Sequence, residues 1–196
     1  MLQYFLIHKP FNVLCQFSPS ENKKTLKDVF NVPPDVYPVG RLDYDSEGFL
    51  ILTNDKSLNK LLLDPIHKHR REYWVQVEGS PTLDSLKKLS AGIFINIDGK
   101  KYLTKNCTAS FFSSPPQINF RNPPIRVRKS IPDTWIKLIL SEGKNRQVRK
   151  MTAAIGHPTL RLIRYAIENA TIDSLMSGQM KEISKQEMYN LLNIKS

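Results

Sequence analysis

Hydrophobic and polar residues alternate along much of the chain in a pattern typical of β-strands. The clearest case is the stretch 72–79, where Tyr73, Val75 and Val77 share one face and polar residues take the other. Short apolar or alternating runs predict further strands at 4–7, 49–52, 93–97, 106–112, 135–140 and 160–164. The strand at 93–97 runs into Asp98-Gly99, a dipeptide that predicts a hairpin turn.

Helical spacing of apolar residues is found between these strands. Helices are predicted at 25–30, 55–62, 81–89, 145–155 and 184–192. Asp55 and Asn145 stand where N-caps are expected, and Gly156 stands where the helix that begins at Asn145 should end. The order of strands and helices lacks the regular alternation of a doubly wound fold. It therefore predicts an α+β protein built on a largely antiparallel sheet.

The stretch 40–55, GRLDYDSEGFLILTND, gathers carboxylates around the apolar strand at 49–52. The four acidic residues are Asp43, Asp45, Glu47 and Asp55. Loops held by rigid elements often carry catalytic side chains, because the scaffold fixes them while the loop exposes them to substrate. A solvated acidic turn is the alternative, and spacing alone favours it.

Positive charge is concentrated in one part of the chain. The 196 residues carry a net charge of +11, with 40% hydrophobic content, which is typical of a globular protein. Residues 121–164 hold eleven lysines and arginines against two acidic residues, a net charge of +9. Such a local excess attracts polyanions, most often nucleic acid. RNA is favoured over an anionic membrane, because the segment lacks a long amphipathic helix with inserted aromatic residues.

Membrane, metal and disulfide functions find little support in the sequence. No apolar run reaches the ~18 residues that a membrane span needs, and the first residues do not resemble a secretory signal, so we expect a cytoplasmic protein. Cys15 and Cys107 are far apart and lack the spacing of a disulfide framework or a zinc site. We expect both to be core thiols.

Two long motifs resemble the signature motifs of RNA pseudouridine synthases of the small-subunit-A (RsuA-like) type. The first is GRLD at 40–43 followed by SEG at 46–48, and the second is EGKNRQVRKM at 142–151. Further similarity lies at 9–10, 71–79 and 122–126. Within the family, the motifs are most similar to the E-type branch that acts on large-subunit (23S) ribosomal RNA. Asn12 and Glu168 stand where the family usually has glycine.

The resemblance implies a pseudouridine synthase fold, with a long mixed, mainly antiparallel sheet in two lobes and a central catalytic cleft. It implies one catalytic domain over 1–196, without the small N-terminal S4-type RNA-binding domain of many relatives. The expected reaction cuts the bond from C1′ to N1 of a uridine, turns the base and joins C1′ to C5. No redox step or activated donor is involved, so we expect no cofactor and no metal. The expected partner is large-subunit ribosomal RNA, bound by a monomer.

The resemblance also implies roles for individual residues. Asp43 matches the catalytic aspartate, which acts beside C1′ as a nucleophile or as a base. Arg149 matches a salt-bridging arginine, and Tyr73 matches the tyrosine that packs against the target base. Val148 is expected to add an apolar wall. Because a stacked uridine cannot be reached, it must flip out, and Arg41 matches the residue that fills the space left behind.

Other interpretations of these residues remain open on pattern alone. Arg149 is equally well a phosphate-binding arginine on a basic helix. Alternation alone favours a core aromatic for Tyr73, and the alternative for Arg41 is a salt bridge to a nearby carboxylate. The residues predicted to bind RNA are Arg41, Lys9, Arg126, Arg128, Lys129, Lys144, Asn145, Arg146, Lys150, Arg161 and Arg164.

Two function classes compete with an RNA-modifying enzyme. A non-catalytic RNA-binding protein in ribosome assembly would account for the charge but would leave Asp43 and Tyr73 without a purpose. A glycoside hydrolase could use Asp43 with Asp45 or Glu47 as an acid and base pair. A neutral sugar substrate would not call for the charge of +9 in one segment.

Overall fold

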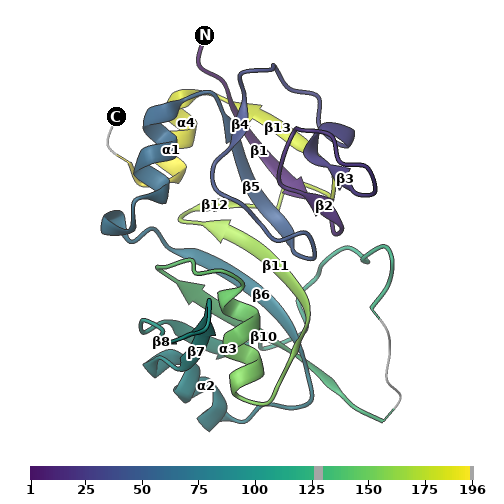
Figure 1. Ribbon diagram of the computed structural model, residues 1–196, viewed down its shortest axis with the longest axis vertical. Helices are drawn as coiled ribbons and strands as arrows, with labels where there is room; N and C mark the ends of the chain where they lie inside the picture. The colour runs from purple at the N-terminus through teal and green to yellow at the C-terminus, as the bar shows by residue number, and fades with distance from the viewer. Residues whose placement is uncertain (126–129, 195–196) are drawn as a thin grey trace. The chain divides into compact units, whose positions relative to one another are not determined.

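The computed structural model describes residues 1–125 and 130–194, which fall into two compact units (Figure 1). The first unit comprises Met1–His69 and Ile163–Ser196, and the second comprises Arg70–Leu162. The boundary therefore falls within one strand, β11 (Thr159–Ile167).

The first unit is built from short and medium strands with two α-helices. Its strands are β1 (Tyr4–Lys9), β2 (Val13–Leu14), β3 (Lys24–Thr25), β4 (Tyr37–Pro38), β5 (Glu47–Thr53), β12 (Ala170–Thr171) and β13 (Met180–Ile183). Its helices are α1 (Lys56–Leu63), α4 (Lys185–Leu191) and the 3-10 turns η1 (Leu26–Asp28) and η2 (Pro65–His67).

Strand β5 lies at the centre of the first unit's sheet. It pairs antiparallel with β1 and β4, and parallel with the second half of β11, while β13 pairs antiparallel with the other edge of β1. All seven of its residues are buried, which explains why the run at 49–52 is continuously apolar instead of alternating. Phe5, Ile7, Leu50 and Leu52 pack together on one face with apolar residues from the loops that precede β4.

A carboxylate joins three elements on the opposite face of this sheet. Asp55 caps α1 by accepting hydrogen bonds from the backbone N–H groups of Ser57 and Leu58. Its Oδ2 atom accepts from the hydroxyls of Tyr4, at 2.7 Å, and Tyr189, at 2.9 Å. The predicted N-cap is therefore confirmed, and the same side chain also ties β1 and α4 to the start of α1.

The second unit places helices and a hairpin against an antiparallel sheet. Its elements are β6 (Arg71–Glu78), α2 (Leu83–Ala91), β7 (Phe94–Ile97), β8 (Lys100–Leu103), β9 (Thr108–Phe111), β10 (Asp133–Leu140), α3 (Gln147–Ala154) and the first part of β11. Strand β10 pairs antiparallel with β6 on one side and with β9 on the other, and β7 pairs with β8.

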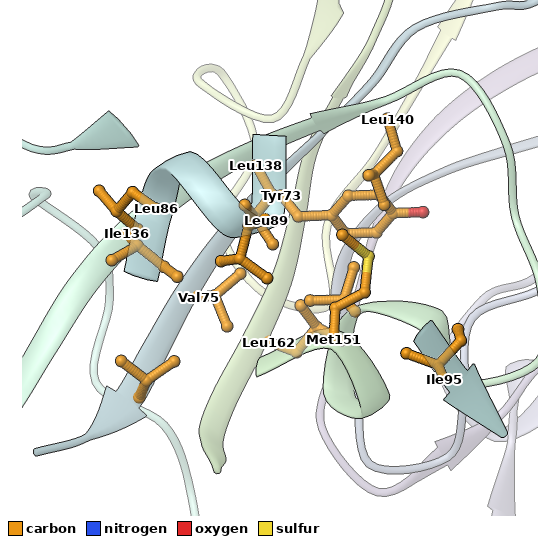
Figure 2. Packing of buried hydrophobic residues seen from close by; sticks show 12 residues of the cluster. Tyr73, Val75, Leu86, Leu89, Ile95, Ile136, Leu138, Leu140, Met151 and Leu162 are labelled. Carbon is orange, nitrogen blue, oxygen red and sulfur yellow. The ribbon is translucent and has the colours of Figure 1, made fainter. Parts of the chain in front are cut away.

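The core of the second unit forms on one face of β6 and β10. Inward residues of these strands, such as Val75 and Leu138, pack against Leu89 of α2, Met151 of α3 and Ile95 of β7 (Figure 2). Because these residues come from five elements spread along the sequence, this core fixes the positions of α3 and the hairpin relative to the sheet.

The expected α+β fold with a mixed, mainly antiparallel sheet is confirmed. Two local expectations are wrong. Helix α2 was predicted to begin at Pro81, but it begins two residues later, at Leu83, with Thr82 as its N-cap. Helix α3 is not capped by Asn145, because its N-cap residue is Arg146 in the left-handed conformation. The short strands β12 and β13 were not expected from the pattern.

Two departures from the family's usual glycines are accommodated without glycine. Asn12 has φ 57° and Glu168 has φ 50°, so both residues take the left-handed conformation that a glycine would favour. Within the described residues, every helix is too short or too polar to cross a membrane.

Candidate functional site

Asp43 lies on a tight turn that leads directly into the buried strand β5. The backbone N–H of Ser46 donates to the carbonyl of Asp43 at 3.1 Å, which closes the turn. The preceding residue is held by a second contact, in which the N–H of Leu42 donates to Sγ of Cys15 at 3.2 Å. The Asp43 side chain is half-buried. A partly exposed carboxylate is thus mounted on a loop whose backbone is fixed at both ends.

Lys9 is buried behind this turn. Its side chain has no exposed surface, and its ammonium donates to the carbonyls of Val13 at 2.7 Å, Pro10 at 2.9 Å and Tyr44 at 3.5 Å. The expected contact of Lys9 with RNA is therefore corrected, because a buried ammonium bound to three carbonyls does not face a polyanion. It holds the turn that carries Asp43.

Charge around Lys9 affects its protonation. Burial lowers the pKa of Lys9 to about 8, although the carboxylates of Glu47, Asp45 and Asp43 act in the opposite direction. These carboxylates therefore favour the charged form of Lys9. This gives the acidic loop an internal positive charge that the sequence pattern did not reveal.

Arg41 and Arg164 flank the same loop but differ in exposure. Arg41 is exposed, as expected for a residue that reaches RNA. Arg164 is only 4% exposed, and its Nε donates to the carbonyl of Phe49 at 2.8 Å. Within the described parts of the chain, its Nη2 atom has no hydrogen-bond partner. Because Arg164 is buried, the prediction that it binds RNA is corrected.

The second motif begins with a buried carboxylate that sequence reasoning did not single out. Glu142 accepts hydrogen bonds from the Tyr102 hydroxyl at 2.6 Å, the Lys105 backbone N–H at 2.9 Å and the Gln147 side-chain amide at 2.6 Å. Gln147 in turn accepts from the backbone N–H of Lys144 at 2.9 Å. Glu142 and Gln147 therefore close the turn before α3 from both ends, with side chains instead of an ordinary cap.

These hydrogen bonds outweigh the effect of burial on Glu142. Burial by itself would raise the pKa of Glu142, but the donors from Tyr102, Lys105 and Gln147 hold it below its ordinary value. The same bond to Glu142 raises the pKa of Tyr102 to about 12. The carboxylate is therefore ionised and the phenol protonated near neutral pH. The one feature of the sequence that could have indicated this hydrogen-bonded turn is that Glu142 and Gln147 occur in the same motif.

Helix α3 presents its basic residues and buries its apolar ones. Lys144, Asn145 and Arg146 are exposed on the turn before the helix, and Arg149 and Lys150 are half-buried. Four positive side chains, two on the turn and two on the helix, thus reach solvent to some degree next to a helix N-terminus, where the backbone adds partial positive charge. The placement suits RNA binding by this motif.

Val148 and Tyr73 belong to the core of the second unit. Val148 is 4% exposed and Tyr73 is 9% exposed, and both pack in the cluster that contains Leu140 and Met151. Tyr73 is therefore a core aromatic, and its hydroxyl end lies at the margin of the labelled cluster in Figure 2. Whether it also meets a target base remains a prediction.

The remaining predicted RNA ligands are placed as follows. Arg161 is 7% exposed and donates from Nη2 to the carbonyl of Asn119 at 3.0 Å, so it supports the long loop before β10. Arg126, Arg128 and Lys129 lie outside the described residues. The first unit thus holds Asp43, Arg41, Lys9 and Arg164. The second unit holds Tyr73, Val148, Arg161 and the basic residues around α3.

Comparison with known proteins connects both motifs to one family. The family model described as RNA pseudouridylate synthase matches residues 3–154. The chain is 49% identical over 172 residues to "Ribosomal large subunit pseudouridine synthase E" of Xanthomonas axonopodis pv. citri, covering 87% of this chain and 88% of the relative. It is 46% identical over 179 residues to the protein of the same name from Vibrio vulnificus, covering 91% of this chain and 74% of the relative.

A solved structure supports the fold. The chain superposes on "Crystal structure of pseudouridylate synthase" with a TM-score of 0.79 at 24% identity, over 97% of this chain and 74% of that one. At 24% identity this match establishes the fold alone, whereas the sequence matches to the family model and to the two relatives establish the family. With the family match extending over both motifs, the chain belongs to the RNA pseudouridine synthases, isomerases that convert uridine in RNA into pseudouridine.

Proposed function

We propose that this chain converts a uridine of large-subunit ribosomal RNA into pseudouridine, with Asp43 as the catalytic residue. The observation that carries the proposal is the sequence identity of 46% and 49% to two relatives named for this substrate. The chain also contains both motifs. The fixed turn that presents the half-buried Asp43 supports the same assignment. We further propose that it acts as a monomer in the cytoplasm, where ribosomal RNA is found.

The reaction is balanced within the substrate. The bond from C1′ to N1 breaks, the base turns, C1′ bonds to C5, the proton on C5 is lost and N1 gains one. In this proposal Asp43 acts beside C1′, either by attacking it or by removing a proton from the sugar. Lys9 holds the backbone of the turn through its hydrogen bond to the carbonyl of Tyr44.

The family resemblance also assigns roles to residues of the second unit. Arg149 is proposed to compensate the charge of Asp43, Tyr73 to pack against the target base and Val148 to form an apolar wall; all three roles rest on the family resemblance. Exposed Arg41 is proposed to fill the space left by the flipped uridine. The positive side chains before and within α3 would bind phosphates.

The proposal is tested by two linked experiments. Pseudouridines are mapped in large-subunit ribosomal RNA from cells with and without the protein, and loss of one site is expected. Purified Asp43→Asn protein should then fold and bind a transcript of this RNA but form no pseudouridine. The matched change Asp45→Asn, two residues away on the same turn, should be far milder. Wild-type turnover by Asp43→Asn would refute the catalytic role of this residue.

A further inference from the structure

The hairpin of β7 and β8 exposes an aromatic and aliphatic pair on its outer face. Phe94 and Leu103 face each other across the two strands, and each is 53% exposed. Lys101, on the same face, places its ammonium 4.2 Å from the centre of the Phe94 ring. Large apolar side chains that remain in water as a neighbouring pair mark a surface suited to binding.

The inner face of the same hairpin fixes its position. Ile95 is buried in the core of the second unit, and the Tyr102 hydroxyl donates to Glu142 of the second motif. Lys144 of that motif places its ammonium 5.1 Å from the centre of the Tyr102 ring. The hairpin is therefore attached through its inner face to the turn that carries the exposed basic residues before α3.

The charge of the hairpin indicates what its outer face binds. Between residues 94 and 105 the chain has three lysines, Lys100, Lys101 and Lys105, and one acidic residue, Asp98. All three lysines are exposed. Within the two strands, Lys101 lies on the outer face with Phe94 and Leu103, whereas Lys100 is on the face of Tyr102. Aromatic rings flanked by positive charge are typical of surfaces that bind single-stranded nucleic acid, in which a base stacks on the ring and the cations meet phosphates.

We propose that the outer face of the β7–β8 hairpin binds an unpaired nucleotide of the RNA substrate, with its base stacked on Phe94 and its phosphate near Lys101. Phe94 is 53% exposed, so it is accessible to a base, and the Lys101 ammonium lies close enough to its ring to meet the phosphate of the same nucleotide. This nucleotide is distinct from the uridine that is modified. The inference rests on the proposed function for the identity of the RNA.

The proposal is tested by exchanging Phe94 in the full chain. The probe is a transcript of large-subunit ribosomal RNA that the wild-type protein modifies. Phe94→Leu should weaken binding of this RNA by about 5- to 150-fold, as expected for loss of one base stack, because leucine keeps apolar contact without an aromatic face. Phe94→Trp should bind like wild type. The control Leu83→Ala, at a 67% exposed residue of α2, should leave the affinity unchanged.

Additional measurements separate the possible outcomes. Circular dichroism and thermal unfolding should be the same for all variants, since the Phe94 side chain is largely outside the core. Crosslinking with 4-thiouridine in the RNA should label a peptide that contains Phe94. Equal RNA affinity of wild type and Phe94→Leu would overturn the proposal and leave a protein partner as the occupant of this face. If the wild type itself modifies no transcript, the proposed function fails first.

Discussion

Gly48 and Arg164 approach each other so closely that no side chain fits at position 48. A Cβ atom there would lie 2.3 Å from the carbonyl oxygen of Arg164 and 2.8 Å from its backbone nitrogen. The two residues are partners in the parallel pairing of β5 with β11, directly after the turn that carries Asp43. Position 48 of the first motif must therefore be glycine, because the backbone of Arg164 occupies the space that a Cβ atom would need.

Gly48→Ala is predicted to destabilise the protein strongly. The residue has φ 111°, which disfavours any side chain, and the neighbouring atoms belong to backbone that cannot move aside. Strain and overpacking together should cost about 3 kcal/mol or more. Thermal unfolding should show a midpoint lower by about 10 °C. The control Gly143→Ala, where an added Cβ atom would meet nothing within 4 Å, should unfold like wild type. An equal effect of both changes would contradict this explanation.

Glu142→Gln is predicted to destabilise the second unit in a pH-dependent way. The folded protein lowers the pKa of Glu142 below its ordinary value of 4.5. The ionised carboxylate therefore contributes stability that is fully present above pH 4.5 and is lost as pH falls through the folded pKa. Replacing the acceptor of three hydrogen bonds should cost about 2 kcal/mol at pH 7.

The measurement is urea unfolding of wild type and Glu142→Gln between pH 7 and pH 3. The difference in unfolding free energy should narrow below pH 4.5, as the wild-type carboxylate takes up a proton. Asp84→Asn serves as the control, since this carboxylate is exposed in a surface pair with Lys87. A difference that stays constant over this range would mean that the Glu142 charge does not stabilise the turn.

The hydroxyls of Tyr4 and Tyr189 are predicted to be energetically coupled. Both donate to the same oxygen of Asp55, so removing one changes what the other contributes. Each change to phenylalanine should cost about 1 to 2 kcal/mol. The double variant should then depart from additivity by about 0.5 kcal/mol or more. Tyr37→Phe, at a 59% exposed tyrosine of the same unit, should have little effect.

Alkaline pH offers a second test of this cluster. Burial and the hydrogen bond to Asp55 raise the pKa of Tyr189 to about 12, from an ordinary value of 10. The protonated phenol therefore contributes stability that is fully present below pH 10 and is lost as pH rises towards 12. Tyr189→Phe should remove this part of the alkaline transition. Identical alkaline unfolding of wild type and variant would exclude the contribution.

The sequence predicted elements better than it predicted which charges are buried. Apolar periodicity located β5, β6 and the hairpin because their side chains alternate or are continuously apolar. Strand β13 escaped prediction since it is short and carries Lys181 and Glu182 on an edge of the sheet. The local sequence pattern indicates which side chains can be buried. Tertiary contacts determine which of these side chains are buried in the folded protein.

The errors in the candidate site have the same physical origin. Lys9 and Arg161 looked like RNA ligands because arginine and lysine are usually exposed. Each is buried against carbonyl oxygens, those of Pro10, Val13 and Tyr44 for Lys9 and that of Asn119 for Arg161. Asn145 looked like a helix cap, but Gln147 and Glu142 bind the turn instead. The assignment of Asp43, by contrast, comes from a linear motif, and its catalytic role stays a prediction.

Lys9→Met is predicted to slow catalysis without weakening RNA binding. The ammonium donates to the carbonyls of Val13 and Tyr44, so its loss frees the backbone of the turn that carries Asp43. Because Lys9 has no exposed surface, it is not expected to contribute to affinity. The turnover number should fall, whereas Kd for the RNA should stay within about twofold. Lys23→Met is the control, since this exposed lysine lies 5.0 Å from the ring centre of Tyr44 on the same turn.

The pH dependence of stability gives this prediction an independent check. Burial lowers the pKa of Lys9 to about 8 from its ordinary value of 10.5, so between these values the unfolded chain binds more protons than the folded one. The free energy of unfolding of wild type should therefore rise relative to that of Lys9→Met as pH increases from 8 to 10.5. A relative stability that falls over this range would refute a lowered pKa. A Kd raised in parallel with lost turnover would instead restore Lys9 as an RNA ligand, since positioning of the Asp43 turn changes catalysis and leaves affinity intact.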